Sequence, residues 1–185
     1  MATTHVNPTR MELTRLKKKL VTALRGHKLL KDKRDELMRQ FLDLVRENKA
    51  LRQKVEAALE SSNRRFMLAR AAMQDEALNT ALLAPKQEVF LDCDTRNVMS
   101  VEIPQFTYKT RTPNQGDIFS YGFAFTSGEL DEAVESLSGI LPDLLRLAET
   151  EKSCQLMAAE IEKTRRRVNA LEHVMIPELQ ENIKY

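Results

Sequence analysis

Hydrophobic residues recur every seven positions along the first part of the chain, from residue 9 to residue 84, a stretch with no proline and a single glycine, Gly26. A period of 3.5 residues predicts an α-helix that winds around a partner helix in a left-handed supercoil. We predict a flexible arm over residues 1–8 and one coiled-coil helix over 9–84. Its predicted core residues are Leu16, Leu30, Leu37, Phe41, Leu44, Leu51 and Val55.

The same spacing returns near the end of the chain. We predict a second coiled-coil helix over residues 129–185, with Pro142 and Pro177 as kinks or breaks. Its core residues are predicted to be Met157, Ile161, Val168, Leu171 and Met175. Pairing the two helices within one chain needs only the closure of the segment between them, so an antiparallel helical hairpin is the expected arrangement.

Between the helices, residues 85–128 lose the helical period. Val89–Leu91 forms an apolar run, and Met99, Val101 and Ile103 alternate with polar residues, so we predict two short strands with a turn over Asp92–Asn97. The predicted fold class is therefore all-α, a long antiparallel two-helix coiled coil with a short β-hairpin insertion in the middle of the chain.

Three polar residues, His27, Arg34 and Asn48, interrupt the rows of the first helix. Polar residues at such positions either fix the register of a coiled coil or leave the seam to contact another subunit, and the sequence leaves both interpretations open. The first predicted helix is also longer than the second by about 20 residues, which is about 30 Å of helix. Its stripe of Leu13, Leu16 and Leu20 would then be uncovered, so we expect either a chain truncated at Tyr185 or a covering protein.

The net charge is only +2, but the charge is unevenly distributed. Residues 10–39 contain 11 Lys or Arg against 4 Asp or Glu, whereas residues 85–151 contain 5 against 12. The two ends of the helix pair are expected either to meet different surroundings or simply to carry solvated faces. Two cysteines, no cleavable leader and no apolar span indicate a reduced, cytoplasmic protein without a transmembrane segment.

Candidate chemistry is sparse in this sequence. The histidines have no metal-ligand spacing, residues 113–128 do not form a phosphate-binding loop, and no Cys–His or paired-carboxylate arrangement is evident. We therefore predict no cofactor, no metal site and no enzymatic activity in this chain. Lys17–Lys19 and Arg165–Arg167 are the only support for nucleic-acid binding, which we keep with a coiled-coil scaffold as the alternative function.

Three segments carry a resemblance to a known family. They are NPTRMELTRLK from Asn7, RGHKLLKDKRDELM from Arg25, and KTRRRVNALEHVMIP from Lys163. Together they resemble the D subunit of V-type and archaeal A-type ATPases. The F-type gamma axle is a poorer match, since it carries a sizeable α/β domain that residues 85–128 are too few to form.

This resemblance implies a non-catalytic central axle that transmits torque between an ATP-hydrolysing ring and a membrane ion-translocating rotor. The implied partners are the catalytic and regulatory A and B subunits of the ring, the small F subunit of the rotor and the membrane-connecting d (or C) subunit. The implied location is cytoplasmic and peripheral to the membrane, and no nucleic acid is expected as a partner. From charge and this placement, we hypothesise that the residues contacting the ring are Arg10, Lys17, Lys18, Lys19, Arg25, Arg165, Arg166 and Arg167.

Overall fold

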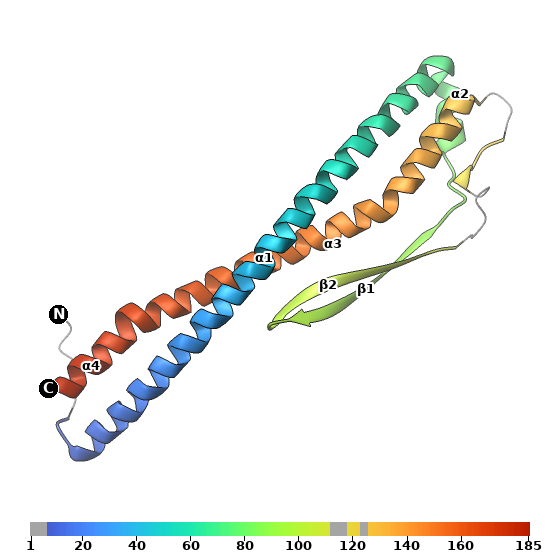
Figure 1. Ribbon diagram of the computed structural model, residues 1–185. Helices are drawn as coiled ribbons and strands as arrows, with labels where there is room; N and C mark the ends of the chain where they lie inside the picture. The colour runs from blue at the N-terminus through green and yellow to red at the C-terminus, as the bar shows by residue number, and fades with distance from the viewer. Residues whose placement is uncertain (1–6, 112–117, 123–125) are drawn as a thin grey trace. The chain divides into compact units, whose positions relative to one another are not determined.

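The computed structural model describes residues 7–111, 118–122 and 126–185. Most of the predicted N-terminal arm lies outside these ranges. The elements in chain order are α1 (Arg10–Ala72), α2 (Asp75–Leu82), β1 (Val89–Val98), β2 (Val101–Thr110), α3 (Gly128–Ala170), the π-helical turn η2 (Leu171–Met175) and α4 (Ile176–Lys184) (Figure 1). The predicted fold class is confirmed: a long helix, a two-stranded antiparallel hairpin and a second long helical segment that packs against the first.

The chain forms two compact units, which we describe separately. The terminal unit contains Met1–Asp43, Met99–Val101 and Gln155–Tyr185. The hairpin unit contains Leu44–Val98 and Glu102–Cys154. In each unit, residues of α1 lie beside residues of the C-terminal helical segment, so both units contain a part of the antiparallel helix pair.

The first helix begins where the sequence predicts and ends earlier. Thr9 Oγ1 accepts a hydrogen bond from the backbone N–H of Glu12 at 3.3 Å, which satisfies one free donor of the first turn. The prediction of one helix to residue 84 is wrong, because α1 ends at Ala72 and α2 follows an extended Gln74. The break lets Leu78 of α2 join a buried cluster with Ala69 and Leu130, and this burial outweighs continued helix.

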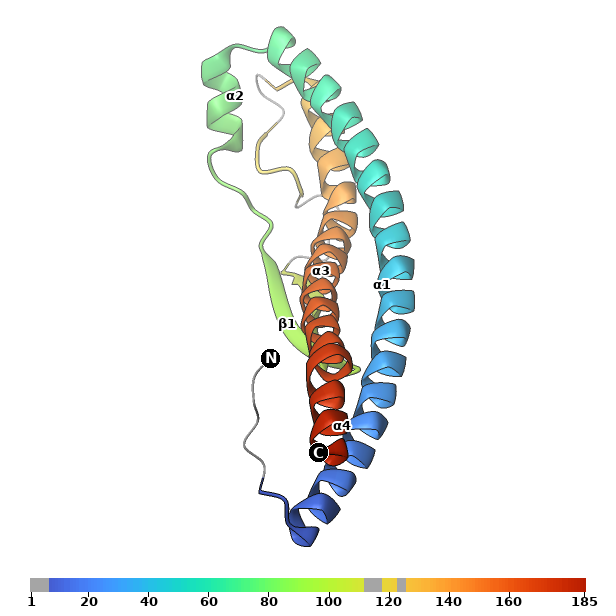
Figure 2. The same cartoon turned by 90° about the vertical axis from the view of Figure 1, so that its left-hand side faces the viewer.

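The earlier end of α1 also changes the expected mismatch in helix length. Leu16 is 7% exposed and lines one small cavity together with Asn182–Tyr185, so the chain's own last residues reach the first turns of α1. Figure 2 shows α4 beside these turns. The expectation that Leu16 lies uncovered is therefore wrong, although Leu13 and Val21 stay 37% and 48% exposed.

The residues predicted for the seam fall into three groups by burial. The buried ones are Leu16, Leu37, Val55, Met157, Ile161 and Val168. The half-buried ones are Leu30, Phe41, Leu44, Leu51 and Leu171. Met175 departs from the prediction, because 49% of it is exposed while the next residue, Ile176, is buried.

The π-helical turn η2 explains this departure. The backbone N–H of Ile176 donates to the carbonyl oxygen of Leu171, five residues earlier, which widens the turn and adds one residue to it. Pro177 follows at once; it has no N–H, and its ring would crowd the His173 carbonyl in a regular helix. The seam therefore advances by one residue, and Ile176, Leu179 and Ile183 replace the row that Met175 was predicted to continue.

The β-hairpin is present, but its turn differs from the predicted one. β1 and β2 are joined by Met99 and Ser100, whose φ angles of 50° and 72° are those of a tight two-residue turn that matches the strand twist. The predicted turn over Asp92–Asn97 is wrong, because these residues extend β1. Arg111 lies opposite Glu88, to which it is linked by a backbone hydrogen bond of 3.0 Å and an ion pair of 2.7 Å.

In the hairpin unit the two long helices approach each other through small side chains. Ser62 is 4% exposed and donates a hydrogen bond from its hydroxyl to the Ala133 carbonyl at 3.3 Å. Ala69 and Ala133 are also buried, with 0% and 3% exposure. α3 passes through Pro142 without a break. Small residues therefore occupy the seam beyond Val55, the last predicted core residue of α1, and let the two helices pack closely there.

Candidate interaction surface

The basic residues singled out in the sequence all lie on the surface of the terminal unit. Their side chains are exposed, on α1 for Arg10, Lys17, Lys18, Lys19 and Arg25, and on α3 for Arg165, Arg166 and Arg167. Arg166 pairs with Glu162 one turn earlier on its own helix. Within the described part of the chain, the other seven form no ion pair. The helix pair thus presents cations that its own carboxylates leave largely uncompensated.

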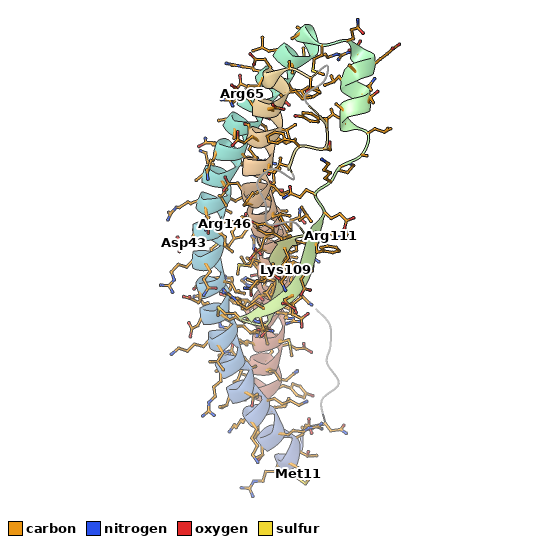
Figure 3. The ribbon with its side chains drawn as sticks, turned by 90° about the vertical axis from the view of Figure 1, so that its right-hand side faces the viewer. Met11, Asp43, Arg65, Lys109, Arg111 and Arg146 are labelled. Carbon is orange, nitrogen blue, oxygen red and sulfur yellow. The ribbon has the colours of Figure 1, made fainter. Side chains whose placement is uncertain are left out.

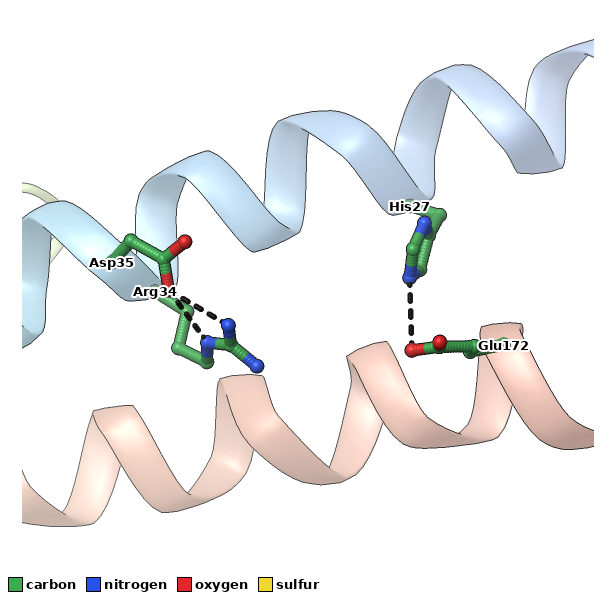
Figure 4. Close-up of polar contacts among 4 residues, drawn as sticks. All are labelled: His27, Arg34, Asp35 and Glu172. Atoms are coloured by element: carbon green, nitrogen blue, oxygen red, sulfur yellow. Dashed lines mark hydrogen bonds and ion pairs between the residues drawn. The ribbon is translucent and has the colours of Figure 1, made fainter.

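A few polar contacts link the helices beneath this surface. His27 Nε2 lies 3.3 Å from Glu172 Oε2 (Figure 4), and Lys33 Nζ lies 3.6 Å from Glu160 Oε1. Arg34 turns instead to Asp35, its neighbour in sequence, at 2.7 Å. Of the three polar interruptions in the rows, His27 thus joins the two helices, and Arg34 forms its ion pair within α1.

Some cations of α1 do have a partner on the same helix, and Arg39 is one of them. Glu36 accepts hydrogen bonds from Arg39 at 2.7 Å and from Gln40 at 2.9 Å. The hydrogen bond from Arg39, and to a smaller extent that from Gln40, lowers the pKa of Glu36. The hydrogen bond to Glu36 in turn raises the pKa of Arg39. Arg39 is therefore bound locally, as Arg166 is, whereas the other seven predicted contact residues have no such ion pair among the described residues.

The terminal unit also contains a groove that the sequence did not predict. It has a volume of about 910 Å³ and runs between the first turns of α1 and the segment η2–α4. Apolar and small residues line it, with charged residues of both signs at the rim: Leu16, Thr22, Ala23, Gly26, Leu171, Met175 and Leu179, and Glu12, Arg15, Lys18, Lys19 and Glu178. Pro177 was the available sequence signal, because a proline after a heptad row can shift the phase of that row.

Ion pairs between the helices are more frequent in the hairpin unit. They join Lys54 to Asp143 at 2.7 Å, Arg146 to Glu47 at 2.7 Å, Arg52 to Glu151 at 3.1 Å and Arg65 to Glu132 at 3.7 Å. Figure 3 shows Arg65 and Arg146 on the two helices and Lys109 and Arg111 on the strand side. Three cations of α1 here meet acidic residues of α3, and Arg146 of α3 meets Glu47 of α1, so these charges are paired within the unit.

The strands add a second layer to the hairpin unit. The backbone N–H of Phe106 on β2 donates to Glu149 Oε2 on α3 at 3.4 Å, at the edge of a cavity of about 390 Å³. Tyr121 donates its phenol hydrogen to Asp131 at 2.9 Å. Burial, with the neighbouring Asp131 carboxylate, raises the pKa of Tyr121 well above its usual range, so its O–H stays a donor.

The two cysteines differ in environment. Cys93 is exposed on β1, whereas Cys154 on α3 is half-buried. Burial, and secondarily the carboxylates of Glu151 and Glu47, raise the pKa of the Cys154 thiol. A cysteine nucleophile needs the opposite shift. The described residues contain no group of three or more His, Cys, Asp or Glu side chains placed to hold a metal ion.

These features define a class of protein: an antiparallel two-helix coiled coil with an inserted β-hairpin, which offers a basic, grooved surface near its two chain ends. Among the described helices, none is long and apolar enough to cross a membrane.

Comparison with known proteins identifies the family. Residues 12–185 match the family described as the D subunit of ATP synthase. The V-type ATP synthase D subunit of Clostridioides difficile is 63% identical over 185 residues, covering all of this chain and 83% of the relative. The proteins of the same name from Acetivibrio thermocellus and Clostridium novyi are 62% and 58% identical, covering all of this chain and 83% and 86% of their lengths. The chain belongs to the family of ATP synthase D subunits.

Proposed function

We propose that this chain is the non-catalytic central axle of a rotary V-type ATPase. It transmits torque between a ring of ATP-hydrolysing subunits and the ion-translocating rotor in the membrane. Its similarity over its full length to proteins named as the D subunit of V-type ATP synthases is the observation that carries this proposal. In the cell it lies on the cytoplasmic side, peripheral to the membrane and held there by the complex.

The helix pair suits the transmission of torque. In the terminal unit, Lys33–Glu160 and His27–Glu172 link the helices across a seam that buries Leu37, and in the hairpin unit Lys54–Asp143 does so beside a buried Val55. Twisting one helix against the other would separate these contacts. A ring whose nucleotide states each favour one axle angle then turns the pair as a body, because differential contact energy is what shifts such an equilibrium.

The family and the distribution of charge support the partners that we propose. We propose the A and B subunits of the ring around the terminal unit, with contacts to Arg10, Lys17, Lys18, Lys19, Arg25, Arg165, Arg166 and Arg167, all of which are exposed. The small F subunit and the membrane-connecting d (or C) subunit are the other proposed partners. Exposed, unpaired cations favour a partner of opposite charge and speed its association.

Direct observation of rotation tests the proposal. The exposed Cys93 is biotinylated, the chain is assembled with the A–B ring and the F subunit, the ring is fixed to glass, and a bead on Cys93 is observed. We expect stepwise rotation in one direction that requires ATP. A chain that assembles into the ring yet stays still while ATP is hydrolysed would overturn the axle role. Reversal of charge at Arg165, Arg166 and Arg167 is expected to weaken assembly, and unchanged assembly and rotation would exclude these contacts.

A further inference from the structure

The groove of the terminal unit has an unusual composition on its α1 wall. Three consecutive groove positions of that helix carry small residues, Thr22, Ala23 and Gly26, and larger apolar side chains lie opposite, Leu171, Met175 and Leu179. A two-helix seam normally fills such positions with side chains that interlock. Here about 910 Å³ stays open beside the seam.

Gly26 has no role that the chain itself explains. It lies inside α1, where glycine weakens the helix relative to alanine, and its φ is not in the left-handed region. Apart from its own stretch of helix, no heavy atom of the described residues lies within 4 Å of the place where a Cβ would be. The space beside Gly26 is therefore available to another molecule.

The π-helical turn supplies the other wall. A regular helix would place Met175 in the seam, toward α1, but η2 rotates it outward, leaving it 49% exposed along the groove. Methionine is flexible and polarisable, so it adapts to the shape of an incoming side chain. The one-residue shift caused by η2 thus leaves the groove open and places the flexible Met175 side chain along its wall.

The charge around the groove selects the kind of partner. Residues 10–25 contain six Lys or Arg and one acidic residue, Glu12. Glu12 already contacts Arg15 at 3.6 Å, while Lys18 and Lys19 on the rim have no ion pair among the described residues. Glu178 is the one carboxylate on the opposite wall. A second copy of this chain would bring the same cations, so an acidic partner is favoured.

We propose that this groove binds an acidic segment of a ring subunit whose apolar side chain enters between Gly26 and Met175. The proposal rests on the axle function above and deepens it by naming the contact. Lys18 and Lys19 meet the carboxylates that flank the apolar side chain. The groove then serves as a bearing surface that each ring position engages in turn.

Filling the groove tests the apolar part of the contact. Gly26→Leu has room in the free chain and is expected to weaken binding to the purified A–B ring by about tenfold or more, as loss of a central pocket does. Gly139→Leu is the matched control: Gly139 lies inside α3 in the hairpin unit, is exposed, and also has nothing within 4 Å of its Cβ position. It is expected to bind the ring like the wild type. Gly26→Ala, which strengthens the helix, should still reduce ring affinity while its melting temperature does not fall.

Reversing the rim charges tests the acidic part. The double variant Lys18→Glu with Lys19→Glu is expected to weaken ring binding by about tenfold at low salt, with a smaller loss at high salt. Lys49→Glu changes an exposed lysine of α1 outside the groove and is expected to leave binding unchanged. Binding of the F subunit and the helical circular dichroism serve as measures of an intact fold for every variant.

A photo-crosslinking residue at position 175 then identifies the occupant in the assembled ring. A crosslink to a ring peptide that contains Asp or Glu beside an apolar residue supports the proposal. A crosslink to another copy of this chain, or to a ring peptide without acidic residues, overturns it. Unchanged ring affinity of both Gly26 variants also overturns it while leaving the axle function intact, whereas a wild-type chain that does not bind the ring refutes the axle function itself.

Discussion

The terminal and hairpin units hold the same pair of helices together in different ways. In the terminal unit the seam is built from Leu37, Ile161 and Val168, and the cations outside it are exposed and largely unpaired. In the hairpin unit, small residues such as Ser62 bring the helices close, and α2 and the strands add a second layer. One heptad pattern therefore supports two kinds of packing, and only one of them leaves a charged surface free.

The uneven charge along the chain has a different outcome in each unit. Acidic residues of α3 accept the cations of α1 in the hairpin unit, as Lys54–Asp143 shows, and Arg146 of α3 meets Glu47 of α1 in turn. The basic excess of residues 10–39 has no such complement, since only a few carboxylates, among them Glu160 and Glu172, lie across the seam in the terminal unit. A charge imbalance becomes a docking signal only where the fold leaves it unmatched.

The largest expected loss of stability comes from a leucine-to-alanine substitution that leaves a cavity in the core of one unit at a time. Leu130→Ala and Leu37→Ala each remove a side chain that is 0% exposed, and each should lower the free energy of unfolding by about 3 kcal/mol. Leu130 packs with Ala69 and Leu78, so its variant should speed amide hydrogen exchange in α2 and the start of α3. Leu37→Ala should instead speed exchange in the parts of α1 and α3 that belong to the terminal unit.

Hydrogen exchange read by mass spectrometry distinguishes the two variants, and exposed Leu29→Ala is the control, because Leu29 is 70% exposed. If both buried variants sped exchange over the same peptides to the same extent, the division into two packing units would be contradicted.

A smaller change in the free energy of unfolding, of opposite sign in the two units, is expected when a buried hydroxyl residue is replaced by valine in each unit. Thr164 in the terminal unit is 1% exposed and its Oγ1 has no hydrogen-bond partner among the described residues. Thr164→Val keeps the shape and removes an unsatisfied hydroxyl, so it should raise stability by about 1 kcal/mol. Ser62→Val in the hairpin unit adds volume where the helices are closest and removes the bond to Ala133, so it should lower stability by about 2 kcal/mol.

Urea unfolding of the two valine variants, with unchanged m-values, measures both changes. Loss of stability in Thr164→Val would show that its hydroxyl is satisfied in solution, and a neutral Ser62→Val would show that the helices have room there.

The sequence predicts the helix pair well because heptad spacing reports a local geometric requirement. It places Leu37, Val55 and Val168 in the seam, where the structure buries them. It misses the break after Ala72, since the burial of Leu78 against Leu130 depends on residues far apart in the chain. It also misses the turn at Met99 and Ser100, because neither residue is one that favours positive φ.

The candidate surface was predicted in part. Charge, together with the placement that the family resemblance implies, identified these cations, and they are exposed because lysine and arginine rarely enter a seam. The groove was not predicted, since it arises from a one-residue phase shift that brings the segment around Pro177 beside small residues near the start of the chain. Heptad counting assumes a regular helix, and a π-helical turn violates that assumption.

The rates at which Cys93 and Cys154 react with an alkylating reagent compare an exposed and a half-buried position of the hairpin unit. Cys93 is exposed, while burial and nearby carboxylates raise the pKa of Cys154 and so reduce its thiolate fraction at neutral pH. Because the thiolate is the reactive form, Cys154 should react with iodoacetamide more slowly than Cys93 by about tenfold. Raising the pH should increase the rate at Cys154, and mass spectrometry of the labelled peptides reads both sites. Equal rates at pH 7 would show that α3 opens readily around Cys154.

The smallest expected effects are the couplings of single ion pairs, and they compare the units directly. Lys54–Asp143 in the hairpin unit is shorter, 2.7 Å, but its lysine is 65% exposed. Lys33–Glu160 in the terminal unit is longer, 3.6 Å, with side chains only 26% and 19% exposed. Double-mutant cycles to alanine should give about 0.5 kcal/mol for the first pair and about 1 kcal/mol for the second, since solvent screens exposed charges more strongly.

Salt separates the contributions of exposure and distance to these couplings. Raising the ionic strength should remove most of the coupling between Lys54 and Asp143 and leave more of that between Lys33 and Glu160, because screening acts less on partly buried pairs. If the coupling of Lys54–Asp143 proved larger and equally resistant to salt, distance would govern these contacts more than burial does. The hairpin unit would then owe more of its cohesion to charge than to the small residues that bring its helices together.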